Sequence, residues 1–183
     1  MSVDTNTQVV LVKRPAPGLV TSDCFALKEA PLREPEDGEI RVKIAYVSLD
    51  PAMRGWINDV RSYMPPVGIG EVMRSYSAGY VEASRHPGYK VGDAVQSVLG
   101  VQQHAVVRGS GRVIKVDTSK APLERWVGGL GMPGWTAYFG LLEVGQPKDG
   151  ETVVVSAASG AVGSVVGQIA KIKGCRVVGI AGG

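Results

Sequence analysis

The most constraining feature of this sequence is its last segment, where two apolar runs flank a turn and a helical pattern. Residues 152–155 (TVVV) form a continuous β-branched run, typical of a strand covered on both faces of a sheet. Residues 157–163 (AASGAVG) follow at once, and apolar side chains then recur at helical spacing as far as Ile172. Gly174 suits the end of a helix, and residues 176–181 form a second apolar run. The pattern predicts a strand, a tight turn, a helix and a parallel strand, joined as one right-handed crossover unit.

Such a unit is too small to form a stable open sheet by itself. The second strand is followed only by Gly182 and Gly183. We therefore expect the chain to be a fragment of a longer protein, cut where its second domain begins. The strand edges and the apolar helix face at Val165, Val166 and Ile169 would lack partners, so we expect the region from residue 130 onward to be poorly packed or paired with another copy in a homo-oligomer.

The chain before residue 130 has a different pattern, made of short β segments separated by glycine and proline. Residues 40–44 (IRVKI) alternate apolar and polar side chains, as in a strand with one buried face. Further strands are predicted at residues 76–83, 94–98 and 113–116. Closely spaced short strands of this kind predict a small barrel or sandwich. We place the domains at residues 1–130 and 131–183, and expect a helix at residues 134–143.

The composition excludes several other classes of protein. The 20 basic and 17 acidic residues leave a formal net charge of +3, which is too small to indicate nucleic-acid binding. The two cysteines, Cys24 and Cys175, fit a reducing compartment, and together with His86 and His104 they are too scattered for a zinc site. No apolar run approaches the roughly 18 residues of a membrane-spanning helix, and the N-terminus lacks a signal-peptide pattern. We expect a cytoplasmic protein with no metal, nucleic-acid or membrane partner.

The turn after the first apolar run indicates the chemistry most clearly. A helix N-terminus offers backbone N–H groups and a favourable dipole to a pyrophosphate, and glycines give the phosphate room. The dinucleotide fingerprint G-x-G-x-x-G occurs here as Ala158, Gly160 and Gly163, with alanine in the first position. We expect Gly160 to let the phosphate approach and Gly163 to let the helix pack against the strand. The alternative is a close-packed turn that binds no ligand, but the flanking strand, helix and second strand favour dinucleotide binding.

The end of the second predicted strand bears on which dinucleotide is bound. NAD-binding units usually place Asp or Glu about 20 residues beyond the glycines, on the ribose hydroxyls. That position falls at Gly182 and Gly183, and no carboxylate side chain occurs after Glu151. The absence of a carboxylate removes repulsion against a 2′-phosphate, so the sequence favours NADP over NAD.

Three further polar residues, Ser159, His104 and Tyr63, can each be interpreted from their position in the sequence. Ser159 belongs to the phosphate turn, since the chain has no G-x-S-x-G motif that would make it a nucleophile. His104 is interpreted as a structural histidine, with a place near a cleft as the alternative. Tyr63 lies in the Pro- and Gly-rich loop of residues 61–70, where we expect a substrate contact.

Three motifs that occur in one order resemble a known family. They are residues 47–55 (VSLDPAMRG), residues 131–138 (GMPGWTAY), and the alanine–glycine turn that ends with residues 167–171 (GQIAK). Together they closely resemble the zinc-independent medium-chain dehydrogenase/reductases, and among these the NADPH-dependent alkenal and alkenone reductases, which include the curcumin and the prostaglandin/leukotriene reductases. The resemblance covers essentially the whole chain. It implies a mixed fold, in which a GroES-like β-barrel domain is followed by the first βαβ part of a Rossmann domain.

The resemblance also implies roles for individual residues. Asp50 resembles part of the loop that lines the nicotinamide end of the cleft, and Met132 and Thr136 resemble the residues that flank the nicotinamide. Ala52 stands where close relatives often have a substrate-facing tyrosine, so we expect a roomier pocket here. The cofactor's phosphates and adenosine ribose would be bound by Ser159, Gly160, Ala161, Val162, Gly163, Ser164 and Gly182. No catalytic side chain is assigned.

The activity that the resemblance implies is an NADPH-dependent reduction of the carbon–carbon double bond of α,β-unsaturated ketones and aldehydes. Hydride adds to the β-carbon, charge develops on the carbonyl oxygen, and a proton is added at the α-carbon. NADPH-dependent quinone reduction is the alternative among enzymes. A non-catalytic GroES-like module that acts by binding or interaction is the alternative of another class. We expect this chain alone to be inactive, because a dinucleotide site that lacks most of its sheet should bind poorly.

Overall fold

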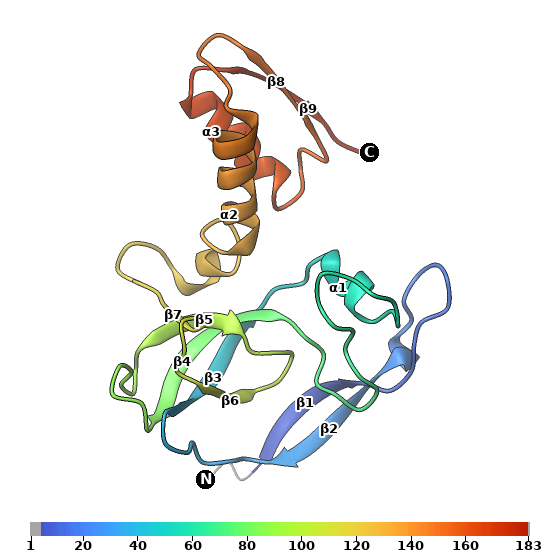
Figure 1. Cartoon of the computed structure of the whole chain (residues 1–183), viewed down its shortest axis with the longest axis vertical. Helices are drawn as coiled ribbons and strands as arrows, with labels where there is room; N and C mark the ends of the chain where they lie inside the picture. Colours follow the sequence, from blue (N-terminus) through green and yellow to red (C-terminus); the bar gives the residue numbers. More distant parts are fainter. Residues whose placement is uncertain (1–4, 183) are drawn as a thin grey trace. The chain divides into compact units, whose positions relative to one another are not determined.

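The computed structural model describes residues 5–182, and the chain divides into two compact units, the first ending at Leu123 and the second beginning at Glu124. Figure 1 colours the first unit from blue to yellow and the second from yellow to red. The first unit is rich in strands, whereas the second combines helices with one pair of parallel strands. The fold is therefore mixed and sheet-rich, as the sequence predicts.

The first unit consists mainly of antiparallel strands. Its strands are β1 (Thr5–Leu11), β2 (Phe25–Pro31), β3 (Glu39–Val47), β4 (Tyr76–Ser84), β5 (Ala94–Val98), β6 (His104–Arg108) and β7 (Ile114–Lys115). Strands β3 to β7 form a five-stranded sheet in the order β6-β3-β4-β5-β7, and β1 pairs with β2 in a separate antiparallel hairpin. The predicted strands at 40–44, 76–83 and 94–98 are confirmed as parts of β3, β4 and β5, and the one at 113–116 contains β7.

The core of the five-stranded sheet follows from the alternation of its side chains. Ile40 and Val42 of β3 are both fully buried, while Arg41 between them lies on the opposite face. The buried members of this core are Ile40, Val42, Val81, Val95, Leu99, Ala105 and Val113. Each strand longer than two residues contributes to one apolar layer, which fixes the register of the sheet.

Hydrogen bonds through His104 attach the β1–β2 hairpin to this sheet. The Asn6 side chain donates to the His104 carbonyl oxygen at 2.8 Å and accepts from the His104 backbone N–H at 2.9 Å. The His104 ring lies 2.8 Å from Glu82 Oε1, and that oxygen also accepts from Arg41 at 2.7 Å. His104 is only 5% exposed, so it has the structural role that the sequence suggested.

A second core of the first unit lies beneath a short helix and its loops. The helical segments here are η1 (Ser22–Cys24) and α1 (Ala52–Trp56). The buried members of this core are Leu11, Cys24, Trp56, Ile57, Val67 and Met73. Arg14 donates to the carbonyl oxygens of Ile57 and Val67, at 3.0 and 2.6 Å, and so ties the segment after α1 to the end of β1. This core fixes α1 and therefore the loop that precedes it.

The second unit contains the predicted crossover. Its elements are η2 (Leu123–Trp126, a 3₁₀ turn that begins at the boundary), α2 (Met132–Phe139), η3 (Gly140–Gly145, a π-helical turn), β8 (Thr152–Ser156), α3 (Gly163–Ile172) and β9 (Arg176–Ile180). Strands β8 and β9 are parallel, with Val153 opposite Val177 and Val155 opposite Gly179. Helix α3 connects them and packs against α2, so the strand, turn, helix and strand order is confirmed.

The core of the second unit is small. One buried cluster consists of Leu141, Ala170 and Cys175, and Ala137 and Val155 are also buried. On the β8–β9 pair, Val153 and Val177 pack against α3, whereas Val154 and Ile180 on the other face are 62% and 58% exposed. One face of this sheet is therefore covered and the other is open within the described part of the chain.

None of the helices described between residues 5 and 182 combines the length and the apolar character that crossing a membrane requires.

Candidate functional site

The turn between β8 and α3 has a sharply bent backbone. Strand β8 ends at Ser156, and Ala157 then takes a left-handed conformation with φ of 48°. This conformation costs an alanine about 1 kcal/mol, so the surrounding structure must impose it. The Ala158 N–H donates to the Ile180 carbonyl oxygen at 3.0 Å, and the Gly160 N–H donates to that of Ala157 at 2.9 Å. These bonds fasten the turn to the end of β9 and leave the chain pointed into α3.

Glycines permit the close approach of helix and strand at this turn. A Cβ on Gly163 would collide with the Ala157 carbonyl oxygen and lie 2.9 Å from the Ala158 Cα, so a glycine at 163 lets the start of α3 approach the turn after β8 closely. A Cβ on Gly160 would lie 3.1 Å from the Ala157 oxygen, so a glycine also suits the turn itself there. The sequence reasoning missed Gly179, whose Cβ would lie 2.8 Å from that of Ala158. A glycine inside an apolar strand was the available signal.

Backbone donors at the start of α3 have no hydrogen-bond partner within the described residues. The N–H groups of Ala161, Val162 and Gly163 donate no hydrogen bond to any acceptor in residues 5–182. Helix bonding resumes at the Ser164 N–H, which donates to the Gly160 carbonyl oxygen at 2.9 Å. No side chain caps this helix, and residues 157–162 are exposed apart from the partly buried Ala158, whereas Gly163 is buried. Free N–H groups at the positive end of a helix dipole are the donors that phosphate groups bind.

A cavity of about 290 Å³ lies beside this turn, along α3. Its lining residues are Val155, Ala158, Gly163, Ser164, Gly167, Gln168, Lys171 and Val177. The strands supply apolar side chains, and one side of α3 supplies a hydroxyl, an amide and an ammonium group. The cavity therefore offers an apolar floor and polar groups next to the free amides.

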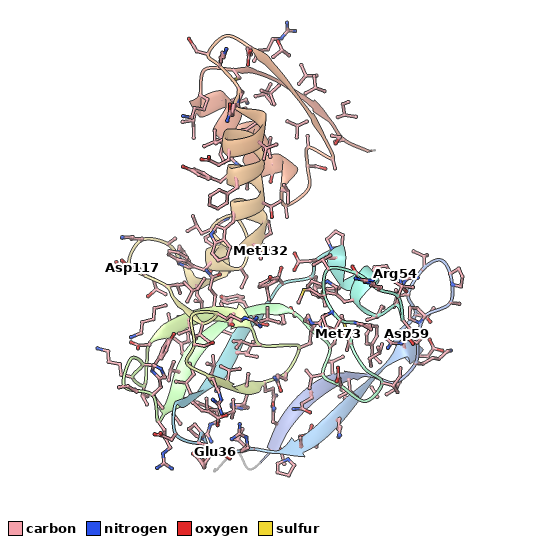
Figure 2. All side chains as sticks on the ribbon, in the orientation of Figure 1. Glu36, Arg54, Asp59, Met73, Asp117 and Met132 are labelled. Carbon is pink, nitrogen blue, oxygen red and sulfur yellow. The ribbon has the colours of Figure 1, made fainter. Side chains whose placement is uncertain are left out.

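The other residues predicted to bind cofactor in the second unit lie apart from the turn in sequence. Met132 begins α2 (Figure 2), and Thr136 is exposed one turn later. The Thr136 hydroxyl donates to the Met132 carbonyl oxygen at 2.8 Å, which leaves its lone pairs available to a donor. Gly182 follows β9 and is exposed.

The remaining predicted site residues belong to the first unit, around α1. Asp50 precedes this helix and Ala52 is its first residue. Tyr63 is 76% exposed, and its hydroxyl oxygen accepts a hydrogen bond from the Trp56 indole N–H at 3.0 Å. Burial, and secondarily the nearby Tyr63 and Asp50, raise the pKa of the Tyr76 phenol above its usual value. Sequence reasoning missed Tyr76, because nothing in the strand pattern distinguishes it from a packing residue.

The potential metal ligands are dispersed. No group of three or more His, Cys, Asp or Glu side chains suited to a metal ion occurs in the described residues. Cys24 and Cys175 are both buried free thiols, and the Cys175 Sγ donates to the Lys148 carbonyl oxygen at 3.3 Å.

The comparisons with curated proteins place these features in context. The chain is 48% identical over 179 residues to the NADPH-dependent curcumin reductase of Escherichia coli (strain K12), a match that covers 97% of the chain and 51% of that protein. It is 40% identical over 173 residues to prostaglandin reductase 1 of Mus musculus, which covers 93% of the chain and 50% of that protein. The chain thus spans about half the length of the curated relatives it matches.

Solved structures agree with this likeness. CurA from Vibrio vulnificus, in its crystal structure in complex with NADPH, is 47% identical with a TM-score of 0.89 over 97% of this chain and 52% of that one. Residues 7–116 match the family model described as the N-terminal domain of oxidoreductase. This match covers more than half of the chain, and the protein therefore belongs to that oxidoreductase family, in the zinc-independent medium-chain dehydrogenase/reductase branch that its motifs indicate.

Proposed function

We propose that the protein containing this chain uses NADPH to reduce the carbon–carbon double bond of α,β-unsaturated ketones and aldehydes. The observation that carries the proposal is the turn before α3, whose free N–H groups suit a pyrophosphate, in a chain whose relatives include NADPH-dependent reductases. In finer detail, we propose a GroES-like barrel for the first domain and the start of a Rossmann domain for the second, with bounds at 1–130 and 131–183.

The residues of this chain would bind and orient the cofactor. Bound NADPH would supply the hydride that adds to the β-carbon of the substrate. The N–H groups of Ala161, Val162 and Gly163 would hold the pyrophosphate, with Ser159, Gly160 and Ser164 beside it. Asp50, Met132 and Thr136 would lie at the nicotinamide end, Gly182 near the adenosine ribose, and Ala52 and Tyr63 near the substrate. No catalytic side chain is proposed.

The nucleotide part of this proposal can be tested on the chain itself. Titration of isotope-labelled chain with NADPH should shift the backbone amide signals of Ala161, Val162 and Gly163, because these donors have no internal partner. NADH should shift the same signals, because it carries the same pyrophosphate, and no carboxylate side chain after Glu151 repels the additional 2′-phosphate of NADPH. Because we expect the chain alone to bind poorly, the decisive titration uses the whole protein, where absence of any shift at the turn would overturn the assignment.

Product analysis separates the enone proposal from its enzymatic alternative. The whole protein should oxidise NADPH with a simple enone and release the saturated ketone. A protein that instead turns over only quinones, and releases hydroquinone, is the quinone reductase. If the whole protein binds NADPH but turns over neither enones nor quinones, a non-catalytic interaction module is the remaining interpretation.

The open face of the β8–β9 pair supports a further part of the proposal, association into a homo-oligomer. The cytoplasmic location proposed for the protein suits its two free cysteines. Val154 and Ile180 expose apolar surface that a second copy would cover. Light scattering of the purified chain should show a mass above that of the monomer. A monodisperse monomer at high concentration would exclude association through this face.

A further inference from the structure

Ala158 is the first residue of the dinucleotide fingerprint, where glycine is usual, and it is in close contact with two glycines from other elements. A Cβ on Gly163 of α3 would lie 2.9 Å from the Ala158 Cα, and a Cβ on Gly179 of β9 would lie 2.8 Å from the Ala158 Cβ. Both distances are below the 3.0 Å that real Cβ atoms keep from other heavy atoms. Ala158 therefore fits only because the helix and the strand each have no side chain at these positions.

Gly179 lies on the face of the β8–β9 pair that α3 covers. Strand side chains alternate between the two faces of a sheet, and Val177, two residues before Gly179, packs against α3. In the parallel register Gly179 is opposite Val155, which is itself buried. Of the described residues, apart from its neighbours in the chain, only Ala158 has an atom within 4 Å of the position that a Cβ on Gly179 would take. A methyl group at residue 179 would therefore press on the turn and on no other element.

The contact between Ala158 and Gly179 joins the two parts of this unit that a dinucleotide would span. The free N–H groups of residues 161–163 follow Ala158 in the turn, and the exposed Gly182 follows Gly179 at the end of β9. Within the described residues a single backbone hydrogen bond joins the turn to β9, from the Ala158 N–H to the Ile180 carbonyl oxygen at 3.0 Å. One hydrogen bond lets the turn pivot about it, so the packing of the methyl group on Gly179 decides how far the turn stands from the strand.

We propose that Ala158 and Gly179 are a matched pair of positioning residues, which sets the spacing between the N–H donors of residues 161–163 and the end of β9. This inference rests on the proposed function and deepens it, because it states what makes the site prefer a whole dinucleotide. In such a ligand the pyrophosphate and the adenosine ribose are joined at a fixed distance, so both are bound well only at one spacing of turn and strand. Inorganic pyrophosphate needs the turn alone, and its binding should not depend on that spacing.

Moving the methyl group between the two positions tests the proposal in the whole protein that contains this chain. Gly179→Ala adds a second methyl group where one fits, and it should weaken NADPH binding about tenfold, the change that one overpacked methyl group typically causes. The affinity for inorganic pyrophosphate should change less than about twofold, because the turn keeps its own donors. The double variant Ala158→Gly/Gly179→Ala leaves one methyl group at the contact and should recover most of the NADPH affinity. Calorimetry measures the NADPH affinity, and competition against NADPH measures that of pyrophosphate.

A readout without cofactor follows the same contact. The amide of residue 158 donates to the Ile180 carbonyl oxygen, so its hydrogen exchange should be faster in Gly179→Ala and slow again in the double variant. Thermal unfolding shows that each variant is folded. Ala158→Gly introduces no clash and removes the methyl group, so it tests the spacing even if Gly179→Ala does not fold, and it should also weaken the binding of NADPH but not of pyrophosphate.

Gly140→Ala is the matched control, because it adds the same methyl group at a position where a Cβ meets nothing within 4 Å. It should change neither affinity. If NADPH and pyrophosphate lose affinity equally in Gly179→Ala and Ala158→Gly, or if the double variant recovers nothing, the pair does not set the spacing and the proposal is overturned. If the unchanged whole protein binds neither ligand, the proposed function is overturned as well, so the two failures are distinguishable.

Discussion

Strand β3 of the first unit and strand β8 of the second both contain several β-branched residues but have very different surroundings. In β3, Ile40 and Val42 are completely buried by residues of the same unit. In β8, Val155 is covered by α3, but Val154 is 62% exposed. The turn that follows β8 is nevertheless fully formed, with its glycine contacts and backbone bonds in place. The geometry of a strand–turn–helix junction therefore depends on local contacts, and a complete core is not needed to build it.

The largest expected effect lies in the first unit's core. Ile40→Ala should lower the free energy of unfolding by about 2–5 kcal/mol, because it opens a cavity in a layer with no exposed member. Val178→Ala in β9 should cost less than about 1 kcal/mol, since Val178 is already 39% exposed. Urea unfolding of both variants measures the contrast. Equal losses would show that the open face of the second unit is covered in solution.

Gly163→Ala tests the local contacts of the turn. The added Cβ would collide with the Ala157 carbonyl oxygen, so we expect a loss of about 1–3 kcal/mol and weaker NADPH binding. Gly140→Ala is the control, because Gly140 is also helical and a Cβ there meets nothing within 4 Å. It should stabilise the chain slightly. If both variants behave alike in unfolding and in NADPH titration, the close approach at Gly163 does not govern the turn.

The sequence predicted those helices and strands whose apolar residues recur periodically within a short stretch of the chain. The runs around α3 and the alternation in β3 define their elements, because burial on one or both faces leaves a periodic signature. Strand β2 was missed, since most of its side chains are exposed and it alternates little. The helix expected at 134–143 exists as α2 continued by the π-helical turn η3.

Only the part of the candidate site that lies within a single turn of the chain could be predicted from the sequence. Gly163 was identified because strand, turn and helix are adjacent in sequence. The unpartnered oxygen of Asp50 was not, because it depends on where the Met53 N–H and the Ser75 hydroxyl donate in three dimensions. The close approach of Gly179 to Ala158 likewise results from the pairing of β8 with β9.

The first unit buries its apolar side chains well, but the buried side chain of Gln96 lacks one hydrogen bond among residues 5–182. It is 7% exposed, and its Nε2 has no hydrogen-bond partner in the described residues. Gln96→Met should therefore be neutral or stabilise the unit by up to about 1 kcal/mol. Gln102→Met should destabilise it, because Gln102 donates to Leu99 and accepts from Asn6. Thermal unfolding distinguishes them, and a destabilised Gln96→Met would mean that its amide has a partner in solution.

The smallest expected effect concerns an ion pair where β3 begins. Hydrogen bonds from Arg33 and from the Glu36 backbone N–H lower the pKa of Glu39 from 4.5 to about 2. A carboxylate with a lowered pKa in the folded state contributes stability above pH 4.5, and this contribution is lost as the pH falls toward 2. Glu39→Gln should therefore flatten the fall of Tm between these values, whereas Glu36→Gln should change it less, because its side chain is 81% exposed. The effect is small because Arg33 is half exposed and solvent screens the pair. If the fall of Tm at acid pH is the same in Glu39→Gln as in the unchanged chain, β3 is stabilised by its buried residues alone. The difference between β3 and β8 would then be one of burial only.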